Sequence, residues 1–171
     1  ILDSAGRLEQ KEISWEEHIR ECIELTESKA VNHVFLEDLK SYFTGNKQNA
    51  TVSLGTPYPS LNRADAYLFA LFTISFDQEK KVKLLESWYA LMTYFLILDD
   101  LIDIKDDFKN NEENALIEAG LSEQGAAIIT EMINRSYTNM EKINPVMSNR
   151  IDHKRQSLDV EAIIKSFLKG Q

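Results

Sequence analysis

Five aspartates directly follow a strongly apolar segment, and their side chains have the clearest chemical potential in this chain. They are Asp99, Asp100, Asp103, Asp106 and Asp107. At 3.6 residues per turn, Asp99 and Asp103 fall on one side of a helix, and Asp100 lies close by. Carboxylate oxygens suit Mg²⁺, which proteins usually hold with one or two carboxylates together with substrate phosphates. The spacing therefore predicts a magnesium site at Asp99, Asp100 and Asp103.

The same carboxylates carry an electrostatic cost. At the C-terminal end of a helix they oppose the macrodipole, at about 0.3–1 kcal/mol each when exposed. Like charges one turn apart add a few tenths of a kcal/mol, and burial would favour protonation. A divalent metal, a neighbouring Lys or Arg, or open solvent would each offset this cost, and solvent requires no function.

The apolar segment before the aspartates predicts the core of the fold. In residues 88–98 only Thr93 is neither apolar nor aromatic. A helix that is apolar on all sides is buried, and eleven residues are too few to span a membrane. We therefore expect an all-α protein, a helical bundle of five to seven helices around a central helix at about 78–108, forming a single helical domain over 1–171.

A side-chain stripe connects the apolar segment with the acidic one. Trp88, Met92 and Phe95 fall on the same side of the expected helix as Asp99, at steps of three or four residues. They have two interpretations. Either they pack in the core, or they line an apolar pocket beside the carboxylates.

Asp99-Asp100-Leu101-Ile102-Asp103 is a DDxxD motif, and together with the preceding LLESWYALMTYFLIL it resembles the first metal-binding region of class I isoprenoid and terpene synthases. The similarity covers about 30 residues. It implies a helical fold with a central pocket, in which Asp99, Asp100 and Asp103 hold Mg²⁺ against a prenyl diphosphate. It also implies that Trp88, Met92 and Phe95 line the pocket.

The resemblance stops at the first motif. Segments 134–141 and 152–159 do not match the spacing of the family's second metal motif, and the arginine pair after the first motif is missing. Two hypotheses follow. One is a reduced relative of the isoprenoid-synthase fold that binds Mg²⁺ and a prenyl diphosphate, with turnover left open. The other is a non-catalytic helical protein that binds a protein partner or forms a homodimer.

The composition disfavours some classes of binding partner. A net charge of −9 and a pI near 4.9 argue against binding to nucleic acids or to anionic membranes. The single cysteine, Cys22, excludes an internal disulfide framework and fits a reducing compartment, so we expect a cytoplasmic protein. Gly-rich phosphate loops, His/Cys zinc spacings and EF-hand loops do not occur in the sequence.

The other elements follow from local signals. Ser14 and Glu17 form a capping box, and the helix after them should reach about Phe43. Its apolar stripe is thin near 27–29, which allows a bend or a break there. A loop over 44–60, which includes the glycosylation triplet at Asn49, should precede a helix starting at Leu61. Asp77 should cap the central helix, a short helix should run over about 111–119 and end at Gly120, and Ser122 should cap a helix that reaches about Ile143. A basic patch at Arg150, His153, Lys154 and Arg155 precedes a last helix from Val160.

Overall fold

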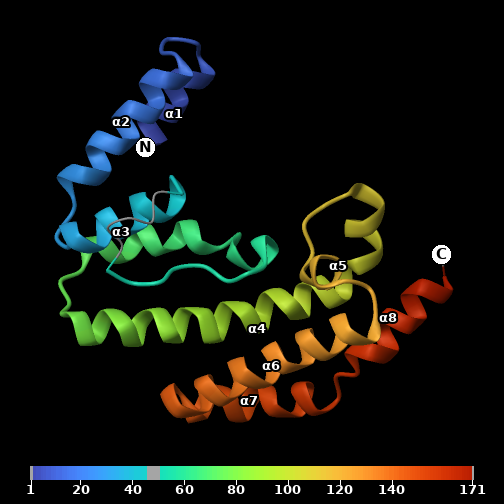
Figure 1. Cartoon of the computed structure of the whole chain (residues 1–171). Coiled ribbons are helices and arrows are strands. Elements are labelled where there is room, and N and C mark those ends of the chain that lie inside the picture. Colours follow the sequence, from blue (N-terminus) through green and yellow to red (C-terminus); the bar gives the residue numbers. More distant parts are fainter. Residues whose placement is uncertain (1, 46–50, 171) are drawn as a thin grey trace. The chain divides into compact units, whose positions relative to one another are not determined.

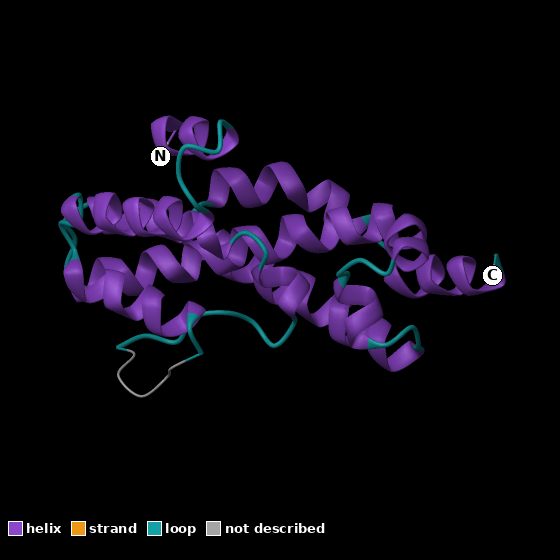
Figure 2. Ribbon diagram, turned by 90° about the horizontal axis from the view of Figure 1, so that it is seen from above, coloured by secondary structure: helices purple, strands orange, loops and turns teal. Residues whose placement is uncertain are grey.

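In the computed structural model, which describes residues 2–45 and 51–170, the chain is helical and the described residues contain no strand (Figure 2). This confirms the all-α class. Eight α-helices are present in that part of the chain, more than the five to seven expected. They are α1 Leu2–Glu9, α2 Trp15–Ser28, α3 His33–Phe43, α4 Gln78–Asn110, α5 Ala115–Ala119, α6 Glu123–Ile143, α7 Pro145–Gln156 and α8 Val160–Lys169 (Figure 1).

Contacts divide the chain into two compact units. The first comprises 1–51 and 67–76, and the second comprises 52–66 and 77–171. In the second unit α4 packs against α6, α5 and α8, and against the short 3-10 helix η2 (Pro59–Asn62). Its core includes Tyr94, Ile97 and Leu98. The central helix therefore lies where the apolar segment predicted it.

Local capping signals set the ends of several helices as expected. The Asp77 side chain accepts the backbone N–H of Lys80 at the start of α4, and Ser122 accepts that of Gly125 at the start of α6. In the first unit, the Ser14–Glu17 capping box is present at α2. Such caps act within one turn, so they are readable from sequence.

Of the bend or break that the thin apolar stripe allowed in the first long helix, the structure shows a break. α2 ends at Ser28, and α3 begins at His33 with Asn32 as its cap. α1 lies beside α2, and the two helices are joined by a hydrogen-bonded ion pair between Arg7 and Glu21 (Figure 1). In α3, Phe35 is fully buried.

One further sequence prediction was wrong. The segment after Leu61 forms 3-10 helices, η2 and η3 (Asp65–Thr73), in place of an α-helix. Its polar side chains bind neighbouring elements, as described below, and these contacts override the local preference. The basic patch lies on a further helix, α7, which has Pro145 at its first turn and Asn144 as cap.

The expected loop over 44–60 is described only in part. Residues 46–50 of the expected loop, and with them Asn49, lie outside the described residues, whereas Thr51 donates its backbone N–H and hydroxyl to Asp38. Among the helices that the structure describes, none combines the length and the apolar character needed to cross a bilayer.

Candidate functional site

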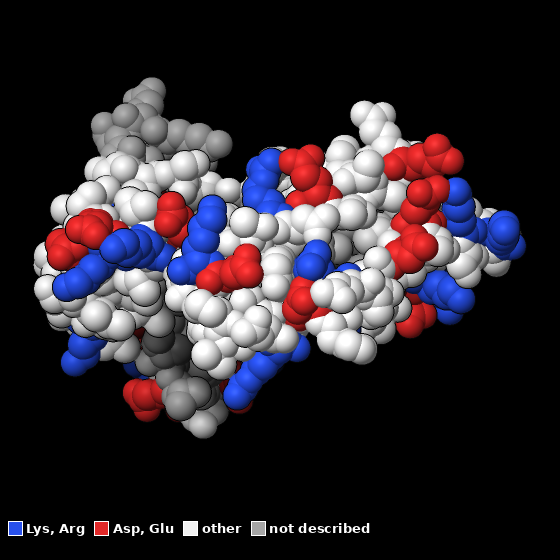
Figure 3. Space-filling model, turned by 90° about the horizontal axis from the view of Figure 1, so that it is seen from below, with Lys and Arg blue, Asp and Glu red and all other residues white. Residues whose placement is uncertain are grey.

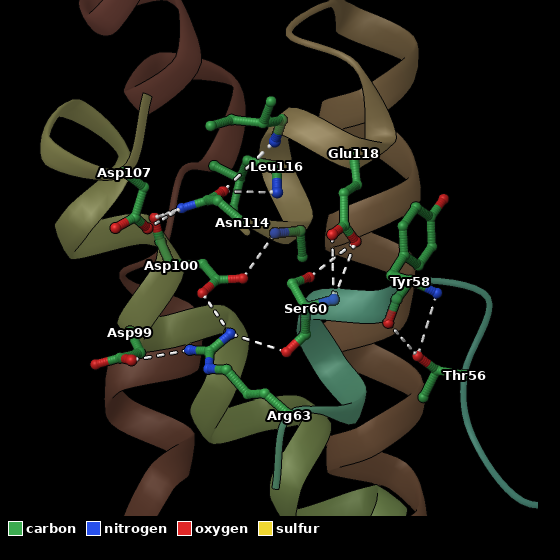
Figure 4. A network of polar contacts seen from close by, with 12 residues as sticks. Thr56, Tyr58, Ser60, Arg63, Asp99, Asp100, Asp107, Asn114, Leu116 and Glu118 are labelled. Carbon is green, nitrogen blue, oxygen red and sulfur yellow. Dashed lines mark hydrogen bonds and ion pairs between the residues drawn. The ribbon is translucent and has the colours of Figure 1, made fainter. Parts of the chain in front are cut away.

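A single arginine holds the first two aspartates of the DDxxD motif (Figure 4). Arg63, which follows η2, places Nη2 2.9 Å from Asp99 Oδ2 and Nη1 2.9 Å from Asp100 Oδ1. It also donates to the carbonyl oxygen of Ser60 at 2.9 Å. The two carboxylates thus converge on one cation, and that cation belongs to the chain.

The two aspartates differ strongly in exposure. The side chain of Asp99 is 63% exposed, whereas that of Asp100 is 2% exposed. Burial raises the pKa of Asp100, and both the hydrogen bond from the Ala115 N–H at 2.7 Å and the Arg63 guanidinium oppose that rise. Asp100 is therefore a buried carboxyl whose charged form depends on these two partners.

Asn114 extends the same group of contacts to the start of α5. This fully buried side chain donates from Nδ2 to the Asp100 carbonyl and to Asp107 Oδ2, both at 2.8 Å. Its Oδ1 accepts the backbone N–H of Leu116 at 2.9 Å and caps α5. One amide side chain therefore supplies hydrogen-bond partners both to groups in the C-terminal part of α4 and to the first turn of α5.

Glu118 joins η2 to α5 on the other side. Its carboxylate accepts the backbone N–H of Ser60 at 3.1 Å and the Ser60 hydroxyl at 2.9 Å. We call this set of contacting residues the Arg63 network. Its members are Ser60, Arg63, Asp99, Asp100, Asp107, Asn114 and Glu118.

The third predicted metal ligand stands apart from this network. Asp103 is exposed on α4. Within the described part of the chain, no group of three or more His, Cys, Asp or Glu side chains is arranged to hold a metal ion. In this arrangement the residues do not fit a metal centre, because the Arg63 guanidinium lies where Asp99 and Asp100 converge.

The predicted pocket residues lie on a partly covered side of α4. Trp88 and Met92 are half-buried, and the side chain of Phe95 is 38% exposed. Trp88 donates its indole N–H to Asp65, 3.0 Å away. Tyr89 donates its hydroxyl to the other oxygen of that fully buried carboxylate. Trp88 therefore helps to attach the 52–66 segment to α4.

A groove of about 480 Å³ lies on another side of α4, between α4 and α8. Ile102, Lys105, Leu158 and Ile163 contribute to its lining. Trp88, Met92 and Phe95 are not among the residues that line it.

The second candidate site is an exposed apolar stripe on α2. Trp15, Ile19 and Ile23 follow each other at steps of four residues, and they are 61%, 41% and 48% exposed. We call these three residues the α2 stripe. No residue of α2 is buried. α1 contacts the neighbouring flank of the helix, where Ser4 binds His18 and Arg7 binds Glu21, and the three residues of the α2 stripe stay exposed.

Comparison with family models, curated proteins and solved structures found no match for this chain. The candidate sites therefore rest on their own geometry.

Sequence reasoning missed Arg63, Asn114 and Asp65. One signal for Arg63 was available, since it is the sole Lys or Arg between Lys47 and Lys80. In an acidic chain, the one basic residue of a long segment is a natural partner for a distant carboxylate that needs a counter-charge.

Proposed function

We propose that this chain is a helical protein that docks an amphipathic helix of a partner on the α2 stripe. The observation that carries the proposal is that α2 has an apolar face and no buried residue. In a folded domain such a face normally packs on the core. A continuous apolar face left open is typical of a protein interaction site.

The size and shape of the stripe fit a helical partner. Trp15 and Ile23 lie eight residues apart, so the stripe extends over about 12 Å of helix. Tryptophan and aliphatic anchors at helical spacing are the usual contacts when one helix lies on another. Burying a fully exposed isoleucine is worth about 1.5–3 kcal/mol. Ile19 and Ile23 are 41% and 48% exposed, so covering each of them contributes roughly half of that value, and Trp15 adds to the sum.

The charges favour a protein partner over nucleic acid. Acidic and basic side chains are interspersed on the face shown in Figure 3, where no broad basic surface is visible. α2 itself carries five glutamates and one arginine, which would repel a phosphate backbone or an anionic bilayer.

A neutral designed peptide tests the proposal. It would be a fluorescein-labelled helix of about 15 residues, matching α2 in length, with a leucine face and a glutamine polar face. Fluorescence anisotropy should show saturable binding to the wild-type chain. Ile19→Gln with Ile23→Gln should weaken binding by at least about tenfold, because the apolar area is lost while helix propensity is kept.

The matched control removes two exposed isoleucines elsewhere. Ile102 and Ile143 are 71% and 44% exposed on α4 and α6, and Ile102→Gln with Ile143→Gln should leave the affinity unchanged. Absence of binding to the wild-type chain, or equal loss in both double variants, would overturn the proposal.

A second candidate function rests on the accessibility of two acidic side chains. Asp99 and Asp103 are exposed, and Asp99 already binds a cation with Asp100. We propose that Mg²⁺, with a prenyl diphosphate as partner, binds here only when Arg63 is released.

Thermal melting with Mg²⁺, alone and with pyrophosphate, tests this second candidate. Binding should raise the melting temperature, and Asp99→Ala with Asp103→Ala should abolish the rise. An unchanged wild-type melting temperature would remove this candidate and leave the first one standing.

A further inference from the structure

Helices α1 and α2 form a hairpin, in which residues 10–14 join the two helices (Figure 1). Within their unit, α1 is the described helix that packs along α2, and the α2 stripe stays exposed beside this contact. Antiparallel helices around a shared apolar core make up a four-helix bundle. The hairpin therefore has the form of one half of such a bundle.

The α2 stripe is symmetric about its central residue. Trp15 lies four residues before Ile19, and Ile23 lies four residues after it. If an identical helix lies antiparallel on the stripe with Ile19 on Ile19, Trp15 of each copy lies opposite Ile23 of the other. Steps of four residues on both helices also match the commonest class of helix packing. The stripe is therefore complementary to itself.

Two charged residues beside the stripe have opposite signs. Glu16 and Arg20 lie one turn apart on the flank away from α1, and both are exposed. Arg20 contacts Glu24 at 4.0 Å, and so exposed an ion pair contributes little. In the antiparallel arrangement this flank faces the same flank of the other copy. Glu16 of each chain then lies within about 3 Å, along the helix axis, of the level of Arg20 in the other, so two equivalent ion pairs form.

The other four glutamates of α2 do not oppose a second copy at the stripe. Glu17, Glu21 and Glu24 project about 140–160° from the centre of the stripe. Glu27 is nearer, but it pairs with Lys40 of α3. The charges that meet at the stripe are therefore those of Glu16 and Arg20.

We infer that the helix docked on the α2 stripe is α2 of a second copy of this chain, in antiparallel orientation. This inference rests on the proposed function and names the partner. Parallel pairing is the poorer arrangement, because the flank with Glu16 and Arg20 would then face the α1 side of the copy, where Arg7 already pairs with Glu21.

The dimer should be weak. The three residues of the stripe cover less than the about 800 Å² per partner of a standard stable interface, so we expect a dissociation constant of roughly 0.1 mM. In dilute, low-micromolar solution the chain is then a monomer with an open stripe.

Sedimentation equilibrium from about 10 µM to about 1 mM tests the inference. The average mass should rise from 19.7 kDa towards twice that value. Ile19→Gln with Ile23→Gln should keep the chain monomeric over this range, because the apolar contact is lost. The control Ile102→Gln with Ile143→Gln, which alters exposed isoleucines of α4 and α6, should dimerise like the wild-type chain.

A charge exchange tests the antiparallel orientation. Glu16→Arg alone and Arg20→Glu alone each place like charges opposite one another, so each should weaken dimerisation roughly three- to tenfold. The two changes together restore opposite charges and should restore dimerisation, with helix content followed by circular dichroism. Glu112→Arg changes the net charge as Glu16→Arg does, at an exposed position outside α2, and should have no effect.

The failures are distinguishable. A wild-type chain that stays at 19.7 kDa at the highest concentration would overturn the inference, and binding of the neutral peptide would still support the proposed function. Association that persists in the Ile19→Gln, Ile23→Gln variant would place the interface elsewhere and overturn the inference too. A charge exchange that fails to restore dimerisation would overturn the antiparallel pairing. Absence of both self-association and peptide binding would overturn the inference and the proposed function together.

Discussion

At the scale of single residues, Arg63 is the group that offsets the electrostatic repulsion between the first two aspartates of the DDxxD motif. A metal, a basic neighbour or solvent could each offset their repulsion, and the structure shows a basic neighbour at Asp99 and Asp100. The buried partner matters more, since an uncompensated charge on Asp100 would be costly. The main structural role of Arg63 is therefore to neutralise Asp100.

Removing the Arg63 guanidinium should destabilise the second unit. We expect Arg63→Ala to cost roughly 2–3 kcal/mol at pH 7, somewhat below the cost of breaking a fully buried pair, because the Arg63 side chain is 31% exposed. The loss of unfolding free energy would be measured by urea unfolding, with hydrogen exchange of the α4 amides as the readout. Arg135→Ala removes an exposed pair with Glu131 and should cost less than about 0.5 kcal/mol; equal costs would contradict the assigned role.

The cost of Arg63→Ala should depend on pH. Burial raises the pKa of Asp100 in the folded state, so its contribution to stability is greatest below the pKa of the unfolded chain and declines as pH rises through the folded-state pKa. Without Arg63 the pKa rises further, and the decline becomes larger. The penalty at pH 7 should therefore shrink near pH ~4, and a penalty equal at both pH values would contradict the role of Asp100.

Asn114 should tolerate neither alanine nor aspartate. Asn114→Ala removes a helix cap and two buried hydrogen bonds, and we expect a loss of about 2 kcal/mol in unfolding free energy. Asn114→Asp keeps the oxygen that caps α5 but places a carboxylate against Asp107. At pH 7 this variant should therefore be no more stable than Asn114→Ala. The exposed cap variant Asn144→Ala, which should cost about 1 kcal/mol or less, is the control in the same denaturation experiment.

At the scale of elements, the features predictable from sequence were those set within one turn of helix. The caps at Ser14, Asp77 and Ser122 each depend on a side chain and the backbone N–H three residues later, so they are visible in the sequence. The central helix was predictable because its apolar segment leaves few alternatives to burial.

The elements that sequence could not predict depend on distant partners. Arg63 and Asp99 lie 36 residues apart, and Ser60 binds Glu118 across 58 residues. These contacts hold η2 in 3-10 form where local propensity favoured an α-helix. The helical spacing of Ile19 and Ile23 indicates an apolar stripe on α2, but amphipathicity does not identify what covers that face.

The turn between α5 and α6 provides a test at this scale. A Cβ on Gly125 would collide with the backbone carbonyl of Gly120, so Gly125→Ala should cost about 2–3 kcal/mol through displaced backbone. Gly6 in α1 has open space around its Cα, so Gly6→Ala should be neutral or stabilising by up to ~1 kcal/mol. Thermal unfolding of both variants checks the difference, and a neutral Gly125→Ala would contradict the described turn.

At the scale of the whole molecule, the two compact units have different features. The second contains the core around α4 and the Arg63 network. The first contains α2, whose apolar stripe is exposed. Because the Arg63 network accounts for the first two aspartates of the DDxxD motif, the α2 stripe is the stronger basis for a function.

The fluorescence of Trp15 tests this conclusion most directly. In a Trp88→Phe chain, Trp15 is the only tryptophan, and its 61% exposure predicts a water-like emission that acrylamide quenches readily. Saturation with the neutral peptide that has a leucine face should shift that emission to the blue and protect it from acrylamide. Emission that is already shielded in the free chain, or unchanged at saturation, would contradict docking on α2.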